Sequence, residues 1–334
     1  MTTRVFEDSE AKRGAVPLMV GLVGPSSGGK TFSALRLATG IQRVTGGDIF
    51  VIDTESRRSL HYADQFKFRH VPFEAPFGPL DYLAAIEHCV KRGAKVVIVD
   101  SMSHEHEGPG GVLEQHAAEV ERQAKRDDGT IDEAKAERVK LGAWAKPKAA
   151  RRRMINTILQ MPISSIFCFR AKEKLEIKTG QPPRPKGFMP IAGEEFVFEM
   201  TINCLLLPKA GGVPTWQSKE IGELATMKLP RQFEQLFADP TPLSEDHGET
   251  MARWAEGGAV SRFEELARDI GAADMATLET VIPPKIEEAK KARAVNPSEY
   301  RSLRAAFATR KKALVAADGG GTGQSDEVTE TAAQ

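Results

Sequence analysis

Several features that mark specialised protein classes are scarce or absent in this sequence. The cysteines number only three, Cys89, Cys168 and Cys204, without C-x-x-C spacing, which predicts reduced and mostly buried thiols in an intracellular protein. No apolar stretch approaches the roughly 18–20 residues that a membrane helix needs, and the polar N-terminal segment lacks the apolar core of a signal peptide. The formal net charge is zero, so no overall field attracts the chain to nucleic acid or membrane. We therefore expect a cytoplasmic protein without membrane contact.

Short apolar runs alternate with helical patterns over the first half of the chain. The runs at 17–23, 49–52, 95–99 and 165–169 predict strands, and helical spacing is found at 31–41, 82–91 and 143–159. This alternation predicts an α/β fold with a mainly parallel sheet covered by helices on both faces. Segments 195–207 and 215–227 predict further strands, which we expect to be antiparallel at the sheet edge.

Composition also predicts how the 334 residues divide into domains. We expect a polar N-terminal arm at 1–14, a core domain at 15–238, a polar linker at 239–258, a small helical module at 259–316 and a disordered acidic tail at 317–334. The last helix of the module should begin at Asn296-Pro297, with asparagine as the cap and proline at the first helical position.

The strongest motif is Gly24-Pro25-Ser26-Ser27-Gly28-Gly29-Lys30-Thr31, between a predicted strand and a predicted helix. It has the G-x-x-x-x-G-K-T spacing of a P-loop, in which glycines let backbone N–H groups turn inward around phosphates. Lys30 would reach the terminal phosphates of ATP, and the Thr31 hydroxyl would ligate Mg²⁺. ATP and Mg²⁺ are therefore the predicted cofactors.

Two carboxylates follow predicted strands, where ligands bind in open α/β sheets. Asp100 ends an apolar strand and would complete the magnesium shell, as a P-loop site requires; the alternative is a carboxylate that caps a helix. Glu55 follows the strand at 49–52 and would orient or deprotonate water for hydrolysis. The competing interpretation of Glu55 is a solvated loop residue.

The order of these motifs along the chain resembles that of the RecA family of recombination ATPases. The phosphate loop comes first, followed by Asp53-Thr54-Glu55, Asp100-Ser101 and a basic residue that ends a strand. The resemblance covers roughly residues 17–236, although Gly28-Gly29 stands where that family usually has Ser-Gly. It implies a RecA-like P-loop NTPase core in which Glu55 activates water. It also implies that Tyr62, seven residues after Glu55, stacks on adenine.

Other polar residues are harder to interpret. Arg170 and Lys172 end the fourth strand and would sense the γ-phosphate or stabilise charge across a subunit interface; a plain basic surface fits equally well. His104-Glu105-His106 suggests a metal ligand set, but without other clustered ligands we interpret it as loop polarity.

A basic segment predicts where nucleic acid would bind. Twelve lysines and arginines but only two acidic residues lie between Lys140 and Lys186. RecA-family proteins bind single-stranded DNA through two loops, which would fall within 103–142 and at about 171–193. The second is long, basic and rich in proline and glycine, and its predicted DNA contacts are Lys174, Lys178, Arg184 and Lys186. A mobile solvated loop beside a basic helix face is the alternative. The first candidate is helical and mixed in charge, which argues against a DNA role.

Taken together, these patterns predict a RecA-like ATPase of phage type, resembling phage single-strand annealing and recombination ATPases with an AAA/RecA core. The resemblance implies DNA-stimulated ATP hydrolysis by a homo-oligomeric ring or filament on single-stranded DNA, in the cytoplasm of a bacterial host. A phage single-strand-binding protein would be a further partner. The helical module resembles modules that end several such proteins, or is a generic appendage. A helicase or helicase loader is one alternative function; a nucleotide-regulated scaffold or packaging partner without DNA binding is another.

Overall fold

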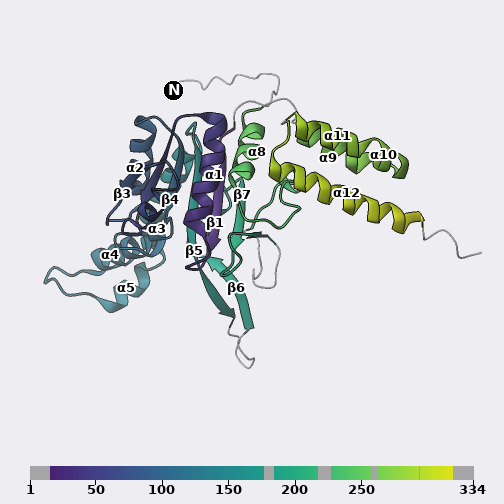
Figure 1. Ribbon diagram of the computed structural model, residues 1–334. Coiled ribbons are helices and arrows are strands. Elements are labelled where there is room, and N and C mark those ends of the chain that lie inside the picture. Colours follow the sequence, from purple (N-terminus) through teal and green to yellow (C-terminus); the bar gives the residue numbers. More distant parts are fainter. Residues whose placement is uncertain (1–15, 177–183, 217–226, 258–261, 293, 319–334) are drawn as a thin grey trace, which may run out of the picture. The chain divides into compact units, whose positions relative to one another are not determined.

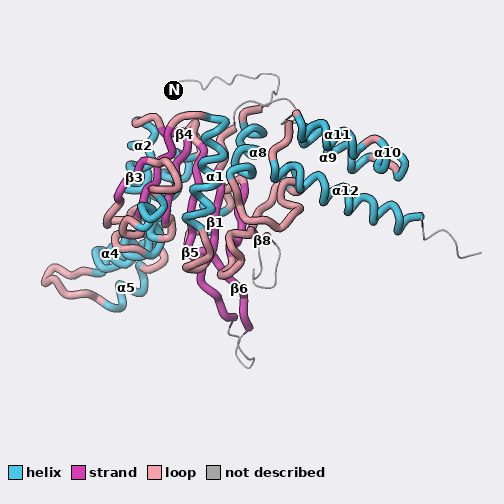
Figure 2. The backbone as a smooth tube through the Cα atoms, in the orientation of Figure 1, coloured by secondary structure: helices cyan, strands magenta, loops and turns pink. Residues whose placement is uncertain are grey.

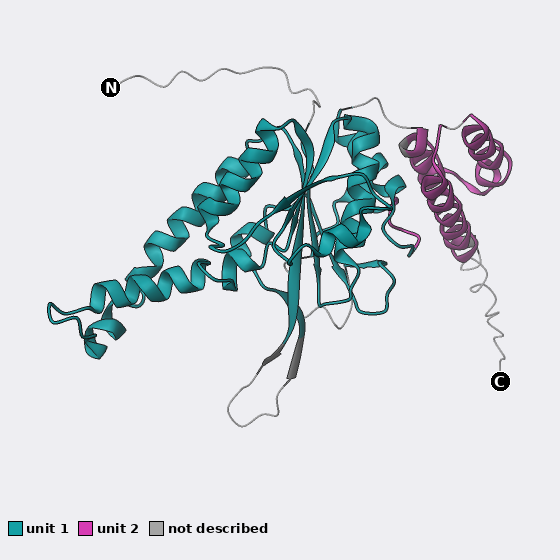
Figure 3. Cartoon of the chain, turned by 60° about the vertical axis from the view of Figure 1, so that its left-hand side comes forward, with its two compact units in different colours: residues 1–234, 240–259 teal, residues 235–239, 260–334 magenta. Residues whose placement is uncertain are grey.

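The computed structural model describes residues 16–176, 184–216, 227–257, 262–292 and 294–318. The chain divides into two compact units (Figure 3), of which the first contains residues 1–234 and 240–259. The second contains residues 235–239 and 260–334. The predicted N-terminal arm lies entirely outside the described residues, as does most of the predicted tail.

The first unit is built on a mostly parallel sheet, as the alternating pattern predicts (Figure 1). Its strands run in the order β3-β2-β4-β5-β1-β7-β8, and β6 pairs with β5 outside this path. Their bounds are β1 Met19–Gly24, β2 Asp48–Asp53, β3 Arg69–Pro72, β4 Ala94–Asp100, β5 Ser164–Glu176, β6 Arg184–Pro190, β7 Ile202–Leu206 and β8 Pro214–Thr215. Only β6 and β8 pair antiparallel with their neighbours among these described strands. The predicted α/β class is confirmed.

Helices cover both faces of this sheet (Figure 3). Helices α2 (Pro79–Lys91) and α6 (Ala145–Ile158) pack on one face, where Tyr82, Ile86 and Met154 join alternate strand residues in one apolar cluster. Helix α1 (Lys30–Thr45) contacts β1, β2, β4 and β5, and its buried residues lie outside that cluster because α1 covers the other face. The remaining elements between β2 and β5 are the 3₁₀ helices η1 (Arg58–Tyr62) and η2 (Gly142–Trp144) and the helices α3 (His104–Glu107), α4 (Val112–Ala124) and α5 (Glu133–Val139).

The prediction of a linker at 239–258 is wrong. Helix α8 (Glu245–Ala255) occupies this segment and packs along α1, with its Ser244 side chain capping the helix. The two helices approach so closely that a Cβ on Gly40 would lie 1.8 Å from the Glu245 carbonyl oxygen, and one on Gly248 would lie 2.1 Å from that of Leu37. Arg36 of α1 also pairs with Glu245 at 2.7 Å. The glycines on both helices thus allow the two backbones to pack closely.

Two further expectations about the end of the sheet need correction. Segment 195–207 is not one strand, because α7 (Glu194–Val197) precedes β7, and β7 pairs parallel with β1 rather than antiparallel. Among the described strands only β8 is antiparallel at this edge, beside an isolated antiparallel bridge between Asn203 and Lys228, and most of the predicted strand at 215–227 lies outside the described residues. The 3₁₀ helix η3 (Arg231–Phe233) follows.

The second unit is helical, as predicted. It contains α9 (Arg262–Ala272), α10 (Met275–Thr280), α11 (Ile282–Lys291) and α12 (Pro297–Asp318) around an apolar cluster that includes Leu266, Leu278 and Leu303. The predicted cap is confirmed, since the Asn296 side chain accepts from the Glu299 N–H at 2.9 Å. Helix α12 continues to Asp318, slightly beyond the predicted start of the tail.

All three cysteines are buried, as predicted. Burial raises the pKa of Cys89 to about 11 and that of Cys204 to about 12, and it raises the pKa of Cys168 well above the ordinary thiol value. Within the described ranges, no helix combines the length and the apolar character needed to cross a bilayer.

Candidate functional site at the carboxyl edge of the sheet

The sequence-predicted residues meet where the parallel strands end. Pairing places Asp53 opposite Asp100, Asp100 opposite Cys168, and Gly24 opposite Arg170. The ends of β1, β2 and β4 and the middle of β5 therefore lie at one edge of the sheet, beside the loop that joins β1 to α1. Because polar side chains of β2, β4 and β5 converge there beside the loop, this edge is the candidate site.

The glycine-rich loop, residues 24–31, encloses the Lys30 side chain. Its ammonium donates to the carbonyl oxygens of Gly24 and Pro25, at 2.9 Å each. Burial lowers the pKa of Lys30, while Cys168, Asp100 and Glu55 oppose that shift. Gly28 is required because a Cβ there would lie 2.5 Å from the Leu206 carbonyl oxygen at the end of β7. The loop is thus pressed between α1 and the neighbouring strand end.

Thr31 and Asp100 are in direct contact. The Thr31 hydroxyl, in the first turn of α1, donates to Asp100 Oδ2 at 2.5 Å. Asp100 is buried, and burial raises its pKa to about 6, although the Thr31 hydrogen bond opposes the shift. A hydroxyl and a carboxylate at this separation offer oxygen donors of the kind that Mg²⁺ prefers. The alternative role for Asp100, as a helix cap, is not supported, since Ser103 is the N-cap residue of α3 and the Asp100 carboxylate accepts from Thr31 instead.

Glu55 is paired with Arg170 rather than solvated. The Arg170 guanidinium donates from Nε at 2.9 Å and from Nη2 at 2.6 Å to the same oxygen, Glu55 Oε1. Arg58 Nη1 lies 3.6 Å from the other carboxylate oxygen. Buried Asp53 shapes the turn that carries Glu55, because its carboxylate accepts from the N–H groups of Glu55 and Ser59 at 2.8 and 3.0 Å. The predicted water-activating residue and the predicted phosphate sensor therefore form one ion pair.

A cleft of about 460 Å³ contains these groups. Its lining combines loop residues with the polar residues of the strand ends: Ser26, Ser27, Gly29, Lys30, Thr31, Glu55, Arg58, His61, Tyr62, Asp100 and Arg170. Arg58 and His61 were missed from the sequence, where they read as ordinary polar residues of a turn. Lys172 lies outside this lining and instead pairs with Glu107 at 2.9 Å.

Tyr62 has an aromatic neighbour that the sequence analysis did not identify. Its ring centroid lies 5.7 Å from that of Phe32, the α1 residue that follows Thr31. Phe32 also lines a second cavity, of about 260 Å³, together with Gly29 of the loop and with Lys209 and Gly212, which follow β7. The position of Phe32 directly after the glycine-rich loop was the one available signal for its place in the site.

The His104-Glu105-His106 sequence is not a polar loop. It forms most of α3, and Glu105 is buried against Arg151 of α6, whose guanidinium donates to both carboxylate oxygens at 2.9 and 2.8 Å. The described part of the chain contains no group of three or more His, Cys, Asp or Glu side chains that could hold a metal ion. Arg151 is only 4% exposed and is therefore withdrawn from the predicted basic surface.

The second predicted DNA loop is largely a β-hairpin. Strand β5 continues past the sheet edge to Glu176 and pairs antiparallel with β6, with Glu176 opposite Arg184 (Figure 2). Lys174 lies on β5, Arg184 and Lys186 lie on β6, and Lys178 falls between them, outside the described residues. The first candidate region is helical, as predicted, and forms α3, α4 and α5.

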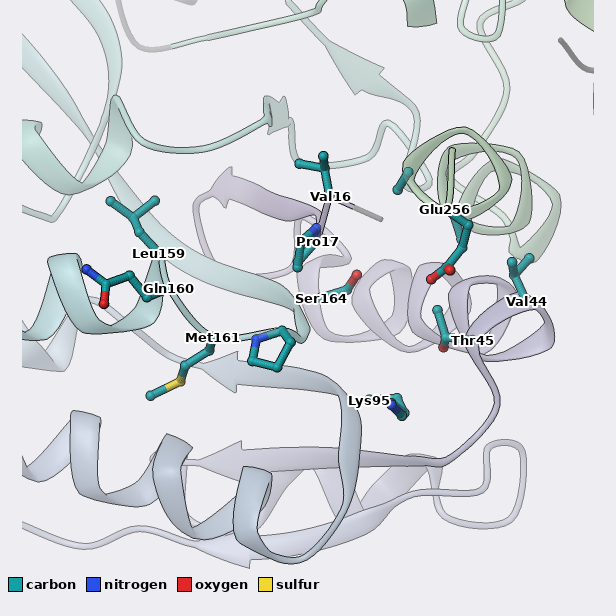
Figure 4. Close-up of a pocket in the computed structure, with 13 residues that line it drawn as sticks. Val16, Pro17, Val44, Thr45, Lys95, Leu159, Gln160, Met161, Ser164 and Glu256 are labelled. Atoms are coloured by element: carbon teal, nitrogen blue, oxygen red, sulfur yellow. The ribbon is translucent and has the colours of Figure 1, made fainter. Parts of the chain in front are cut away.

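Another cavity, of about 420 Å³, lies at the opposite edge of the sheet (Figure 4). Its lining includes Pro17, Lys95 and Ser164 at the amino ends of β1, β4 and β5, and Glu256 just after α8. It contains none of the predicted site residues.

No model of a known protein family matches the chain, and no curated protein matches it either.

Proposed function

We propose that this chain is an ATPase with a RecA-like core, which binds ATP with Mg²⁺ at the carboxyl edge of its sheet and acts on single-stranded DNA. The observation that best supports ATP binding is the convergence of Lys30, Thr31, Asp100, Glu55 and Arg170 on one cleft. These residues come from the loop after β1 and from strands β2, β4 and β5, yet they supply the cation, oxygen donors and carboxylate that phosphoryl transfer uses.

Each group has a defined part in the proposed reaction. Lys30 would exchange its two carbonyl partners for the terminal phosphate oxygens, and Thr31 and Asp100 would hold the metal. Mg²⁺ would supply charge neutralisation between the β- and γ-phosphates. Glu55 orients the attacking water, and Arg170 balances the charge of the γ-phosphate. Because Arg170 now engages Glu55, the phosphate and the carboxylate compete for one guanidinium.

The proposed DNA role is supported by the hairpin of β5 and β6. Its strands carry Lys174, Arg184 and Lys186, and β5 also carries Arg170 at the edge of the cleft. Strand β5 therefore links the basic hairpin to a residue of the phosphate site, so DNA bound at the hairpin would act on the ATP site through this strand. Recombination or strand annealing by a ring or filament is the function we propose for this arrangement.

The test is ATP hydrolysis by the purified full chain, with Mg²⁺, in the presence and absence of a single-stranded oligonucleotide. Hydrolysis that the oligonucleotide stimulates supports the proposal. Strand annealing without unwinding would then favour an annealing protein over a helicase or a helicase loader. ATP binding without any response to DNA would favour a nucleotide-regulated scaffold, and failure to bind ATP would refute the proposal altogether.

A further inference from the structure

His104 contacts the segment that carries Glu55, although it lies on a different element. It is the first residue of α3, just after β4, and its Nδ1 lies 2.8 Å from the Thr54 hydroxyl oxygen. The imidazole also stacks on the Phe77 ring, with centroids 5.1 Å apart and planes inclined by 27°. Two elements therefore fix the orientation of this ring.

The Thr54 hydroxyl joins the ends of two strands. It accepts a hydrogen bond from the Ser101 N–H at 2.8 Å, and the Thr54 N–H donates to the Asp100 carbonyl oxygen at 2.8 Å. Thr54 directly precedes Glu55, and both of its partners belong to the Asp100-Ser101 end of β4. These bonds set the position of the proposed water-activating carboxylate relative to the proposed metal ligand.

The Thr54 hydroxyl has few hydrogen-bonding positions, and these define the role of His104. A hydroxyl has one hydrogen and two acceptor positions, and the Ser101 N–H already uses one acceptor position. The Thr54 hydroxyl donates its hydrogen to the Ser101 carbonyl oxygen at 3.1 Å, and this oxygen also accepts from the Tyr82 hydroxyl at 2.8 Å. Burial and the nearby Arg170 lower the pKa of His104, which favours a neutral ring, and the second acceptor position of Thr54 Oγ1 is the one open to a hydrogen on Nδ1.

We infer that His104 is a positioning residue for ATP hydrolysis, which acts through the Thr54 hydroxyl to hold Glu55 in register with Asp100. The inference rests on the proposed function. Neither His104 nor Thr54 lines the cleft, so both act on the reaction only through the turn that follows β2. The group that they orient is the Glu55 carboxylate, and the binding of ATP through Lys30 and Thr31 does not depend on them.

Matched substitutions separate the hydrogen bond from the packing. His104→Phe keeps an aromatic ring against Phe77 but removes Nδ1, whereas His104→Asn places an amide near the position of Nδ1. Thr54→Val and Thr54→Ser form the corresponding pair on the partner. For each full-length variant, kcat and KM would be measured with ATP and Mg²⁺, the Kd of a non-hydrolysable ATP analogue by calorimetry, and the fold by thermal unfolding.

We expect His104→Phe to lower kcat by about 5–50-fold, the range for leaving a buried hydrogen-bonding group unsatisfied. The Kd of the analogue should stay within about two-fold, and His104→Asn and Thr54→Ser should recover most of the rate. The double variant Thr54→Val/His104→Phe should be about as slow as Thr54→Val alone, because both changes remove one interaction.

Unchanged kcat in His104→Phe, in a wild-type protein that hydrolyses ATP, overturns the inference and leaves the proposed function standing. Equal loss of kcat, analogue affinity and thermal stability in His104→Phe and His104→Asn also overturns it, because it shows a purely structural residue. If His104→Phe does not fold, a Thr54→Val rate equal to that of Thr54→Ser overturns it independently. A wild-type protein without ATP binding or hydrolysis refutes the proposed function itself, a result distinct from the others.

Discussion

The contact between α1 and α8 allows a stability prediction whose size follows from the structure. Gly40→Ala places a methyl carbon where a Cβ lies 1.8 Å from the Glu245 carbonyl oxygen. Carbon and carbonyl oxygen normally approach no closer than about 3.3 Å. The obstacle is backbone, so no rotamer change relieves it, and α8 must move away from α1 by roughly 1.5 Å.

This displacement outweighs the benefit of alanine in a helix. Alanine is favoured over glycine within a helix by about 1 kcal/mol, whereas overpacking costs about 1–3 kcal/mol, and occasionally more. Separation of the helices also disturbs buried Met251 and Ala252 of α8. We expect a net loss of up to about 2 kcal/mol, which lowers the Tm of a unit of this size by up to about 8 °C.

The matched control is Gly271→Ala in the last turn of α9. A Cβ there meets nothing within 4 Å, so the same substitution should be neutral or should stabilise the chain by up to about 1 kcal/mol. Thermal unfolding followed by circular dichroism compares the two variants with the wild type. A Gly40→Ala protein that unfolds at or above the wild-type temperature would refute the close contact and would support the predicted linker at 239–258.

Three further predictions concern the site. Lys30→Ala should weaken ATP binding by about 10–150-fold, from the loss of roughly 1.5–3 kcal/mol of charge-assisted hydrogen bonding; an unchanged Kd by calorimetry would contradict the phosphate-loop assignment. Glu55→Gln should keep ATP affinity while slowing turnover by about 10²–10⁴-fold, and equal steady-state rates in variant and wild type would place the base elsewhere. Replacing Lys178, Arg184 and Lys186 with alanine should flatten the log–log salt dependence of single-stranded DNA binding by roughly 2, at about 0.7 per phosphate contact. Wild-type affinity and salt dependence in that triple variant, measured by fluorescence anisotropy, would exclude the hairpin as the DNA site.

The sequence predicted the residues at the sheet edge because their signal is local. A strand, a glycine-rich loop and a helix follow one another from residue 19 to residue 45, and a carboxylate follows each of two apolar strands. In a parallel sheet all such ends meet at one edge, so position along the chain was enough to bring Lys30, Glu55 and Asp100 together.

What the sequence did not predict depends on contacts between distant residues. Helix α8 lies in a polar segment, and its close approach to α1 depends on Gly40 and Gly248, a contact that hydropathy along the chain does not detect. Arg151 has the same charge as its neighbours in the basic segment, and only its pairing with Glu105 removes it from the surface. The extension of β5 is likewise fixed by pairing with β6, whose prolines and glycine favour a loop.

The burial of all three cysteines has a practical consequence for labelling experiments. Thiolate is the form that reacts with maleimides, and burial both shields these sulfurs and disfavours the thiolate. A cysteine introduced at an exposed position, such as Leu141→Cys between α5 and η2, would therefore be the one that a fluorophore modifies in the folded protein. The native thiols need not be removed first. The rate at which they are modified would report how fast the α/β core opens.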